Sequence, residues 1–334
     1  MNTVKQIAEA IKNKNFKPIY FLMGDEPYYI DKIADLIANS VLTEEEKGFN
    51  QMVLYGGDVT IDAIVANAKR FPMMADYQVI IVREAQHLSR TIENLGSYVE
   101  NMQPTTILVV CYKYKTLDKR KKLAKLVSKN GVLFESKKLY DNQIPDWIRR
   151  VLAGKKYKIE DKAAIMLSEF LGSDLSKISN ELNKLMSLLP HGATITAIDI
   201  ERNIGISKDY NIFELRKSIG KRDITKANKI ITYFAQNPKT NPLVVIISLL
   251  FSYFTQLLQY HALTDKSNAS VARALKISPY FAKDYATAAR NYSMRKIAQI
   301  ISYLNDADAK SKGVGARQLD NGAILKELLF KILH

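Results

Sequence analysis

Cysteine and histidine are scarce in this sequence of 334 residues, which contains one cysteine and four histidines. The single thiol, Cys111, excludes an intramolecular disulfide framework and fits a reducing compartment, so we expect a cytoplasmic protein. The histidines are widely separated and form no cluster of metal ligands. No serine–histidine–aspartate or cysteine–histidine arrangement stands out, so we predict no catalytic residue, no metal and no cofactor. Cys111 is expected to be a small buried apolar residue.

Long apolar runs are also missing. The longest, residues 242–251, is well short of the roughly 20 residues that a membrane-spanning helix needs, and we interpret it as a buried helix. The first 15 residues have an amphipathic helical pattern without the apolar centre of a secretory signal. The formal net charge is +15. That excess favours a polyanionic partner such as nucleic acid, although an ordinary basic surface would have the same composition.

Residues 18–32, PIYFLMGDEPYYIDK, contain the pattern around which the chain is organised. The apolar residues 19–23 predict a buried parallel strand, Gly24 a sharp turn, and Pro27 the first turn of a helix. P-loop proteins bind phosphate at this point with the sequence Gly-x-x-x-x-Gly-Lys-Ser/Thr. Here Asp25 and Glu26 occupy the turn and would repel a phosphate, and no Gly-Lys-Ser/Thr follows. The sequence therefore predicts the frame of a nucleotide-binding fold without the nucleotide chemistry.

The end of the third predicted strand gives the same result. An ATPase would have acidic residues there to hold magnesium. This strand is instead followed by Arg83 and Glu84, and an arginine would oppose the metal ion. Without a phosphate-binding lysine and a metal site, Glu84 has no reaction to serve as a base. We therefore predict that this position is not an ATPase site and is an ordinary solvent-facing strand end.

Strand and helix patterns alternate up to about residue 138, which predicts βαβ units and a parallel sheet covered on both faces. The five strands are expected at residues 19–23, 51–55, 78–82, 105–110 and 131–135. Residues 43–48 are interpreted as a charged turn and residues 88–99 as a helix. Beyond residue 140 the strand signals stop. Helical patterns continue to the last predicted helix at 318–333, and Thr196 with Asp199 forms a capping-box pattern.

Phe71, Pro72, Met73 and Met74 form an apolar corner before the third strand. Composition alone favours a core position for paired methionines. At a helix tip, however, neighbouring side chains point about 100° apart, so they cannot both be buried in one direction. Methionine is flexible and polarizable and fills a partner's pocket well, so an exposed protein-binding wedge is the alternative.

A basic stretch at residues 113–129 includes Lys119, Arg120, Lys121 and Lys122. These side chains could face DNA phosphates. They could equally form the solvated face of a helix whose leucines point inward. The sequence does not separate the two interpretations.

Four stretches carry a resemblance to a known family. They are YFLMGDEPYYI at 20–30, the segment 75–85 that follows Met73 and Met74, LGSDL at 171–175 with NELNKL at 180–185, and NIFEL at 211–215 with later short matches. With these stretches in this order, the chain resembles the delta subunits of bacterial DNA polymerase III, which open the sliding clamp within the clamp loader.

The resemblance implies α/β plus all-α architecture: a degenerate AAA+ domain with a P-loop-like five-stranded parallel sheet at 1–139, a helical lid at 140–207 and a helical collar at 208–334. It implies a subunit that neither binds nor hydrolyses ATP, so Gly24, Asp25, Glu26, Arg83 and Glu84 would be the remnant of a nucleotide site. Met73 and Met74, with the preceding Phe71 and Pro72, would be the clamp-binding wedge. The best-known members pair leucine with phenylalanine at these two positions, so two methionines are a departure.

The implied partners are the sliding clamp (beta subunit), the motor subunits (gamma/tau), delta-prime and primed DNA within a replisome at the nucleoid. The chain would be a non-catalytic part of a nucleotidyltransferase holoenzyme. A delta-prime identity is disfavoured because the Ser-Arg-Cys motif of an arginine finger is missing. The alternatives are a free-standing basic DNA-binding protein with an AAA+-like fold and an active AAA+ motor, which the turn at 24–26 argues against.

Overall fold

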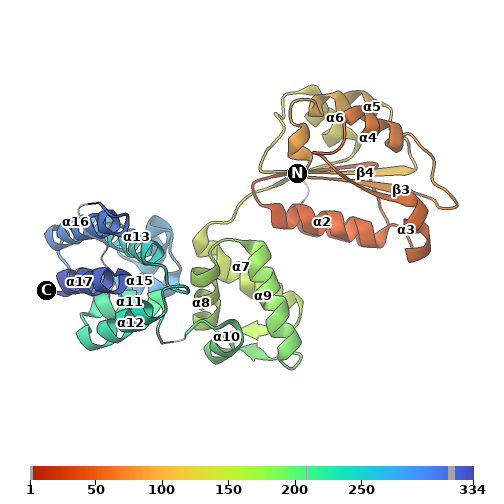
Figure 1. Ribbon diagram of the computed structural model, residues 1–334. Coiled ribbons are helices and arrows are strands. Elements are labelled where there is room, and N and C mark those ends of the chain that lie inside the picture. Colours follow the sequence, from red (N-terminus) through yellow and green to blue (C-terminus); the bar gives the residue numbers. More distant parts are fainter. Residues whose placement is uncertain (1–2, 208, 315–319) are drawn as a thin grey trace. The chain divides into compact units, whose positions relative to one another are not determined.

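The computed structural model describes residues 3–207, 209–314 and 320–334. The chain forms two compact units, Met1–Leu139 and Tyr140–His334, which are described separately (Figure 1). The predicted division of the helical part into a lid and a collar stays a prediction, and residue 208, where the collar was expected to begin, lies outside the described residues.

A five-stranded parallel sheet in the order β2-β3-β4-β1-β5 forms the centre of the first unit. The strands are β1 (Ile19–Gly24), β2 (Gln51–Tyr55), β3 (Gln78–Arg83), β4 (Thr106–Lys113) and β5 (Val132–Ser136). All five lie at or within three residues of the predicted segments, and the α/β plus all-α fold class is confirmed. All strands are parallel, so the turn after β1 lies at the carboxyl edge of the sheet, where α/β folds bind ligands. In the strand order, β1 lies between β4 and β5.

Helices cover both faces of this sheet, as Figure 1 shows for α2 on one side and α4, α5 and α6 on the other. Alternate residues of β1 point to opposite faces. Tyr20 and Leu22 pack with α1 (Val4–Lys12) and α2 (Pro27–Ser40). Ile19, Phe21 and Met23 pack with α4 (Ile61–Ala68) and α6 (Lys122–Asn130). Burial on both faces explains why the strands appear in the sequence as continuous apolar runs.

Two predictions for the first unit were wrong. Residues 43–48 are not a turn: α3 (Glu44–Asn50) begins there, capped by a reciprocal pair of hydrogen bonds between Thr43 and Glu46. Residues 88–99 are not one helix but the short turns η1 (Ala85–Leu88) and η2 (Ile92–Leu95) followed by α5 (Gly96–Glu100). The capping box was present in the sequence as Thr-x-x-Glu, and the helix that it starts ends at Asn50.

In the described part of the second unit the regular structure is helical apart from two short strands, β6 (Lys158–Ile159) and β7 (Thr194–Ile195), which pair in parallel and were not predicted. The N-terminal helices of this unit are η3 (Asp141–Gln143), α7 (Ile144–Gly154), α8 (Asp161–Leu171), α9 (Leu175–Leu188) and α10 (Ala197–Ile204). The predicted capping box of Thr196 and Asp199 is confirmed at the start of α10.

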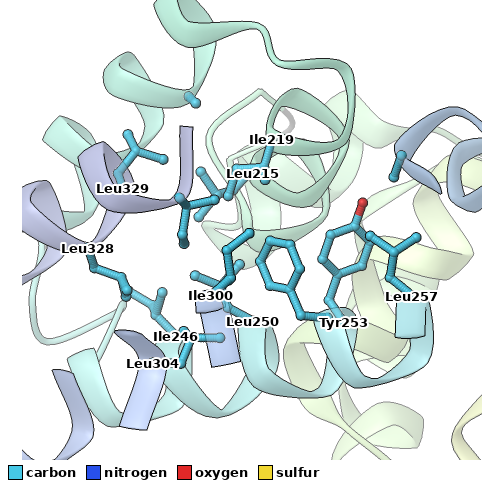
Figure 2. Close-up of a cluster of buried hydrophobic side chains, with 14 of the residues drawn as sticks. Leu215, Ile219, Ile246, Leu250, Tyr253, Leu257, Ile300, Leu304, Leu328 and Leu329 are labelled. Atoms are coloured by element: carbon cyan, nitrogen blue, oxygen red, sulfur yellow. The ribbon is translucent and has the colours of Figure 1, made fainter. Parts of the chain in front are cut away.

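The remaining helices share one large core (Figure 2). They are α11 (Ile212–Lys221), α12 (Ile224–Gln236), α13 (Leu243–Ala262), α14 (Asn268–Leu275), η4 (Pro279–Phe281), α15 (Ala282–Asn291), α16 (Met294–Ser311) and α17 (Asn321–Leu333). Figure 2 shows side chains of α11, α13, α16 and α17 meeting in this core. The predicted start of the last helix, at residue 318, lies outside the described residues.

Within the described ranges, α13 is the one helix long and apolar enough to cross a membrane by length and composition, a property that the core helices of soluble proteins share. The uninterrupted apolar run of residues 242–251 lies at the start of this helix, which continues to Ala262. Leu250, Phe254 and Leu257 of α13 are buried, and the helix packs against α11, α14, α15 and α16. These contacts support the predicted buried helix.

Candidate functional site

Acidic side chains occupy the turn after β1. Gly24 has a φ of 122°, and a Cβ atom there would lie 2.1 Å from the carbonyl oxygen of Ser136. Glu26 is 4% exposed, and its carboxylate accepts a hydrogen bond from the backbone N–H of Tyr28 at the start of α2 (3.1 Å). A helix N-terminus attracts anions, and here it already holds one. Asp25 is exposed beside it and adds a second negative charge.

An ion-pair cluster occupies the neighbouring strand ends. Arg83, at the end of β3, lies 2.7 Å from the carboxylate of Asp35 and 3.5 Å from that of Asp31, both on α2. Lys113, at the end of β4, lies 3.0 Å from Asp31 and 2.7 Å from Glu84. In a P-loop ATPase the cation follows the first strand and the acids follow the third. Here the arrangement is reversed. The acids lie on α2, which follows the first strand, and the cations lie at the ends of β3 and β4.

The pairing favours the charged forms of Glu84 and Lys113. The hydrogen bond from Lys113 lowers the pKa of Glu84. Burial opposes the charge of Lys113, but its bonds to Glu84 and Asp31 outweigh burial and raise its pKa. The predicted solvent-facing strand end is only partly so, because Arg83 is 26% and Glu84 36% exposed and both are ion-paired. Sequence reasoning placed Lys113 in a basic loop and missed it, together with Asp31 and Asp35.

The apolar corner before β3 is exposed. Met74 is fully accessible, Met73 is 58% exposed and Phe71 is 76% exposed, whereas Pro72 is half-buried. The core interpretation of the paired methionines was wrong, and the expectation that at least one of them is exposed is confirmed.

The corner is a loop and not a helix tip, because α4 ends at Ala68. Met74 has a φ of 53°, in the left-handed region that residues with a Cβ rarely adopt. Asn50, the last residue of α3, forms hydrogen bonds with both backbone polar groups of Met73. Sequence reasoning missed Asn50, although the capping box of α3 would have indicated the helix that carries it.

The basic residues proposed to face DNA are exposed, and each pairs with a carboxylate of this chain. The pairs are Lys119–Glu135 at 2.7 Å, Arg120–Asp118 at 2.8 Å, Lys121–Glu93 at 3.8 Å and Lys122–Glu100 at 2.6 Å. Exposed pairs of this kind are worth about 0–1 kcal/mol, so a phosphate could displace them. A carboxylate of this chain therefore matches each of these four charges, and a DNA-facing role for them stays a prediction.

The second unit contains a pocket of about 440 Å³ lined by residues of α8, α11, α13 and α15. Arg216 in its wall donates to Glu169 and to the carbonyl oxygen of Leu249. The lining carries both signs of charge, and it includes no residue of the turn at 24–26, which belongs to the first unit. This pocket is therefore not the nucleotide site of a P-loop frame.

No group of three or more potential metal ligands occurs among the residues that the structure describes. Cys111 is a free thiol, fully buried in β4 as expected, and burial raises its pKa to about 12.

Comparison with known proteins places the chain in a family. The model of the DNA polymerase III delta subunit matches residues 20–137 and that of its C-terminal domain matches residues 209–332, together more than half of the chain. The curated DNA polymerase III subunit delta of Bacillus subtilis (strain 168) is 26% identical over 340 residues, 99% of this chain and 97% of the relative. The solved structure of the Bacillus subtilis DNA clamp loader delta protein is 25% identical, covers 99% of both chains and has a TM-score of 0.61. The chain therefore belongs to the family of DNA polymerase III delta subunits.

Proposed function

We propose that this chain is the clamp-binding subunit of a clamp loader and that it opens the sliding clamp without binding or hydrolysing nucleotide itself. The observation that carries the proposal is the tip formed by Met73 and Met74. These are two large apolar side chains exposed on a loop whose backbone is hydrogen-bonded to Asn50. Large exposed apolar groups are costly in water and mark sites of protein binding.

The nucleotide-free part of the proposal rests on the first unit. A triphosphate at the turn after β1 would have to displace the Glu26 carboxylate from the N-terminus of α2. It would also meet Asp31 and Asp35, which already neutralise Arg83 and Lys113. Arg83 lies where a P-loop ATPase has an acid that holds magnesium, and its positive charge would repel the metal ion. We therefore assign ATP hydrolysis to partner subunits.

Binding energy limits how far the wedge can open a ring. The wedge shifts the clamp toward an open form only by the difference between its affinities for the open and closed forms. ATP binding by gamma/tau motor subunits would expose the tip in the assembled loader, with delta-prime completing the ring. Hydrolysis would then release the clamp around primed DNA. The helices within residues 212–311 and 321–333 share one core, and such neighbours would assemble on their outer surface.

The proposal is tested by surface plasmon resonance between the full chain and the sliding clamp of the same organism. Fully burying a methionine side chain is worth about 1.5–3 kcal/mol, so Met73→Ala with Met74→Ala should weaken binding on the order of a hundredfold or more. Met294→Ala is the matched control, because Met294 is also exposed (52%) but lies in the second unit. Circular dichroism checks that each variant is folded.

Equal binding by the wild type and the folded double variant would show that the wedge is elsewhere. A fluorescent ATP analogue bound with micromolar affinity would refute the nucleotide-free assignment. If the chain does not bind the clamp but binds DNA tightly with a steep salt dependence, it is instead a free-standing DNA-binding protein.

A further inference from the structure

One side chain holds the backbone of the exposed loop. Asn50 is 4% exposed, and its Nδ2 group donates hydrogen bonds to the carbonyl oxygens of Met73 (2.9 Å) and Glu46 (3.1 Å). Its Oδ1 atom accepts a hydrogen bond from the N–H of Met73 (2.6 Å). The Asn50 amide therefore forms hydrogen bonds with both the N–H and the carbonyl group of Met73, as a neighbouring β-strand would. Through its bond to Glu46 it also connects Met73 to the last turn of α3.

A second amide fixes the start of the same loop. Gln78, 8% exposed, donates from its Nε2 group to the carbonyl oxygen of Arg70 and to the hydroxyl of Thr106. The Thr106 hydroxyl in turn donates to the carbonyl oxygen of Ala68 (2.8 Å). The segment between Ala68 and Met73 is thus tied to the folded unit at both ends by buried polar groups.

The next residue carries the strain that this attachment supports. Met74 has a φ of 53°, and its side chain is fully exposed, so no packing of its own side chain stabilises that backbone conformation. A residue with a Cβ persists in the left-handed region only where its surroundings hold it there. The nearest such constraint is the pair of hydrogen bonds between Asn50 and Met73, one residue earlier in the chain.

We infer that Asn50 is a positioning residue that preorganises the Met73/Met74 tip for its protein partner. The inference rests on the proposed function, in which that partner is the sliding clamp. A loop that is already ordered loses less conformational entropy on binding, so holding it raises affinity without any contact between Asn50 and the clamp. Without Asn50, the loop would sample many conformations and binding would have to order it.

The test compares Asn50→Ala with Asn67→Ala in the full chain. Asn67 also donates from Nδ2 to the carbonyl oxygen four residues earlier, that of Ala63 (2.9 Å), but the structure shows no bond from its side chain to Met73. We expect Asn50→Ala to weaken clamp binding on the order of tenfold and Asn67→Ala to leave it unchanged. Should Asn50→Ala not fold, Asn50→Asp keeps the acceptor for the Met73 N–H but turns a carboxylate oxygen toward the carbonyl oxygens of Met73 and Glu46, so it should also release the loop and weaken binding.

A double-mutant cycle separates positioning from general stability. If Asn50 acts through the tip, then Asn50→Ala should weaken binding much less in a Met74→Ala background than in the wild type. An equal effect in both backgrounds, or no effect of Asn50→Ala on affinity, would overturn the inference.

Trypsin gives a readout that does not depend on the clamp. Cleavage after Lys69 and Arg70 should be faster in Asn50→Ala than in Asn67→Ala, because the loop that follows these exposed residues is released. Faster cleavage without a change in clamp affinity would show that Asn50 holds the loop but does not serve binding, which also overturns the inference. Failure of the wild type to bind the clamp would instead refute the proposed function.

Discussion

Replacing Lys113 with methionine tests whether the ion-pair cluster at the carboxyl edge of the sheet stabilises the first unit. The ammonium group of Lys113 lies 3.0 Å from Asp31 and 2.7 Å from Glu84. Methionine keeps most of the buried stem but removes the charge, so both carboxylates lose a partner. The change leaves the strand in place and deletes only the electrostatic contact.

The expected loss follows from the exposure of the groups. The side chains are 12% exposed for Lys113, 33% for Asp31 and 36% for Glu84. Removing one partner of a buried pair costs about 3–5 kcal/mol, whereas exposed pairs contribute about 0–1 kcal/mol. The cluster lies between these limits and Arg83 remains beside Asp31, so we expect Lys113→Met to lower the free energy of unfolding by about 1–2 kcal/mol.

The chain supplies its own internal control for this measurement. Trp147, the only tryptophan, is 3% exposed and belongs to the second unit, so its fluorescence follows that unit alone. Circular dichroism follows both units. In urea, Lys113→Met should lower the midpoint of the part of the dichroism transition that belongs to the first unit and leave the tryptophan transition in place. If the dichroism midpoints of the variant and the wild type coincide, the cluster contributes nothing to stability and our reasoning is wrong.

Two further substitutions test other parts of the structure. Burial opposes the charge of Glu214, but hydrogen bonding and charge from Lys226 and Lys162 outweigh it and lower its pKa below 4.5. A carboxylate with a lowered pKa stabilises the fold above its unfolded pKa and loses that effect as the pH falls through its folded pKa. Wild type should therefore melt at a higher temperature than Glu214→Gln above pH 4.5, with the difference vanishing in acid; a constant difference would contradict this. Gly24→Ala should cost about 3 kcal/mol or more in urea unfolding, because its Cβ would overlap a backbone oxygen of β5. Gly57→Ala, whose Cβ meets nothing within 4 Å, should change stability little.

The elements of the first unit were largely predictable because their signals are local. Strands buried on both faces must be apolar throughout, so runs such as 19–23 and 78–82 identify themselves in the sequence. The cap Thr196 bonds to a residue three positions later, and its helix begins where this residue indicated. Strands β6 and β7 could not be found in this way, because two residues are too short to carry an alternating pattern.

The charged groups at the carboxyl edge of the sheet were half predictable. Asp25 and Glu26 follow Gly24 directly, so the repulsion of phosphate could be inferred from neighbours in the chain. The cation of β4 could not. Lys113 and Asp31 are 82 positions apart, and only the parallel pairing of β1 with β4 places the end of β4 beside α2.

The sequence by itself determined the five strands of the first unit, the alternation that builds a parallel sheet, and the absence of a phosphate-binding motif, because each depends on residues close together in the chain. The tertiary structure decided what the side chains do. Composition favoured a buried Met73 and Met74, yet both side chains are exposed on a loop whose backbone is hydrogen-bonded to Asn50 at the end of α3. Exposure depends on contacts between segments 23 residues apart, and no local pattern of residues records such contacts.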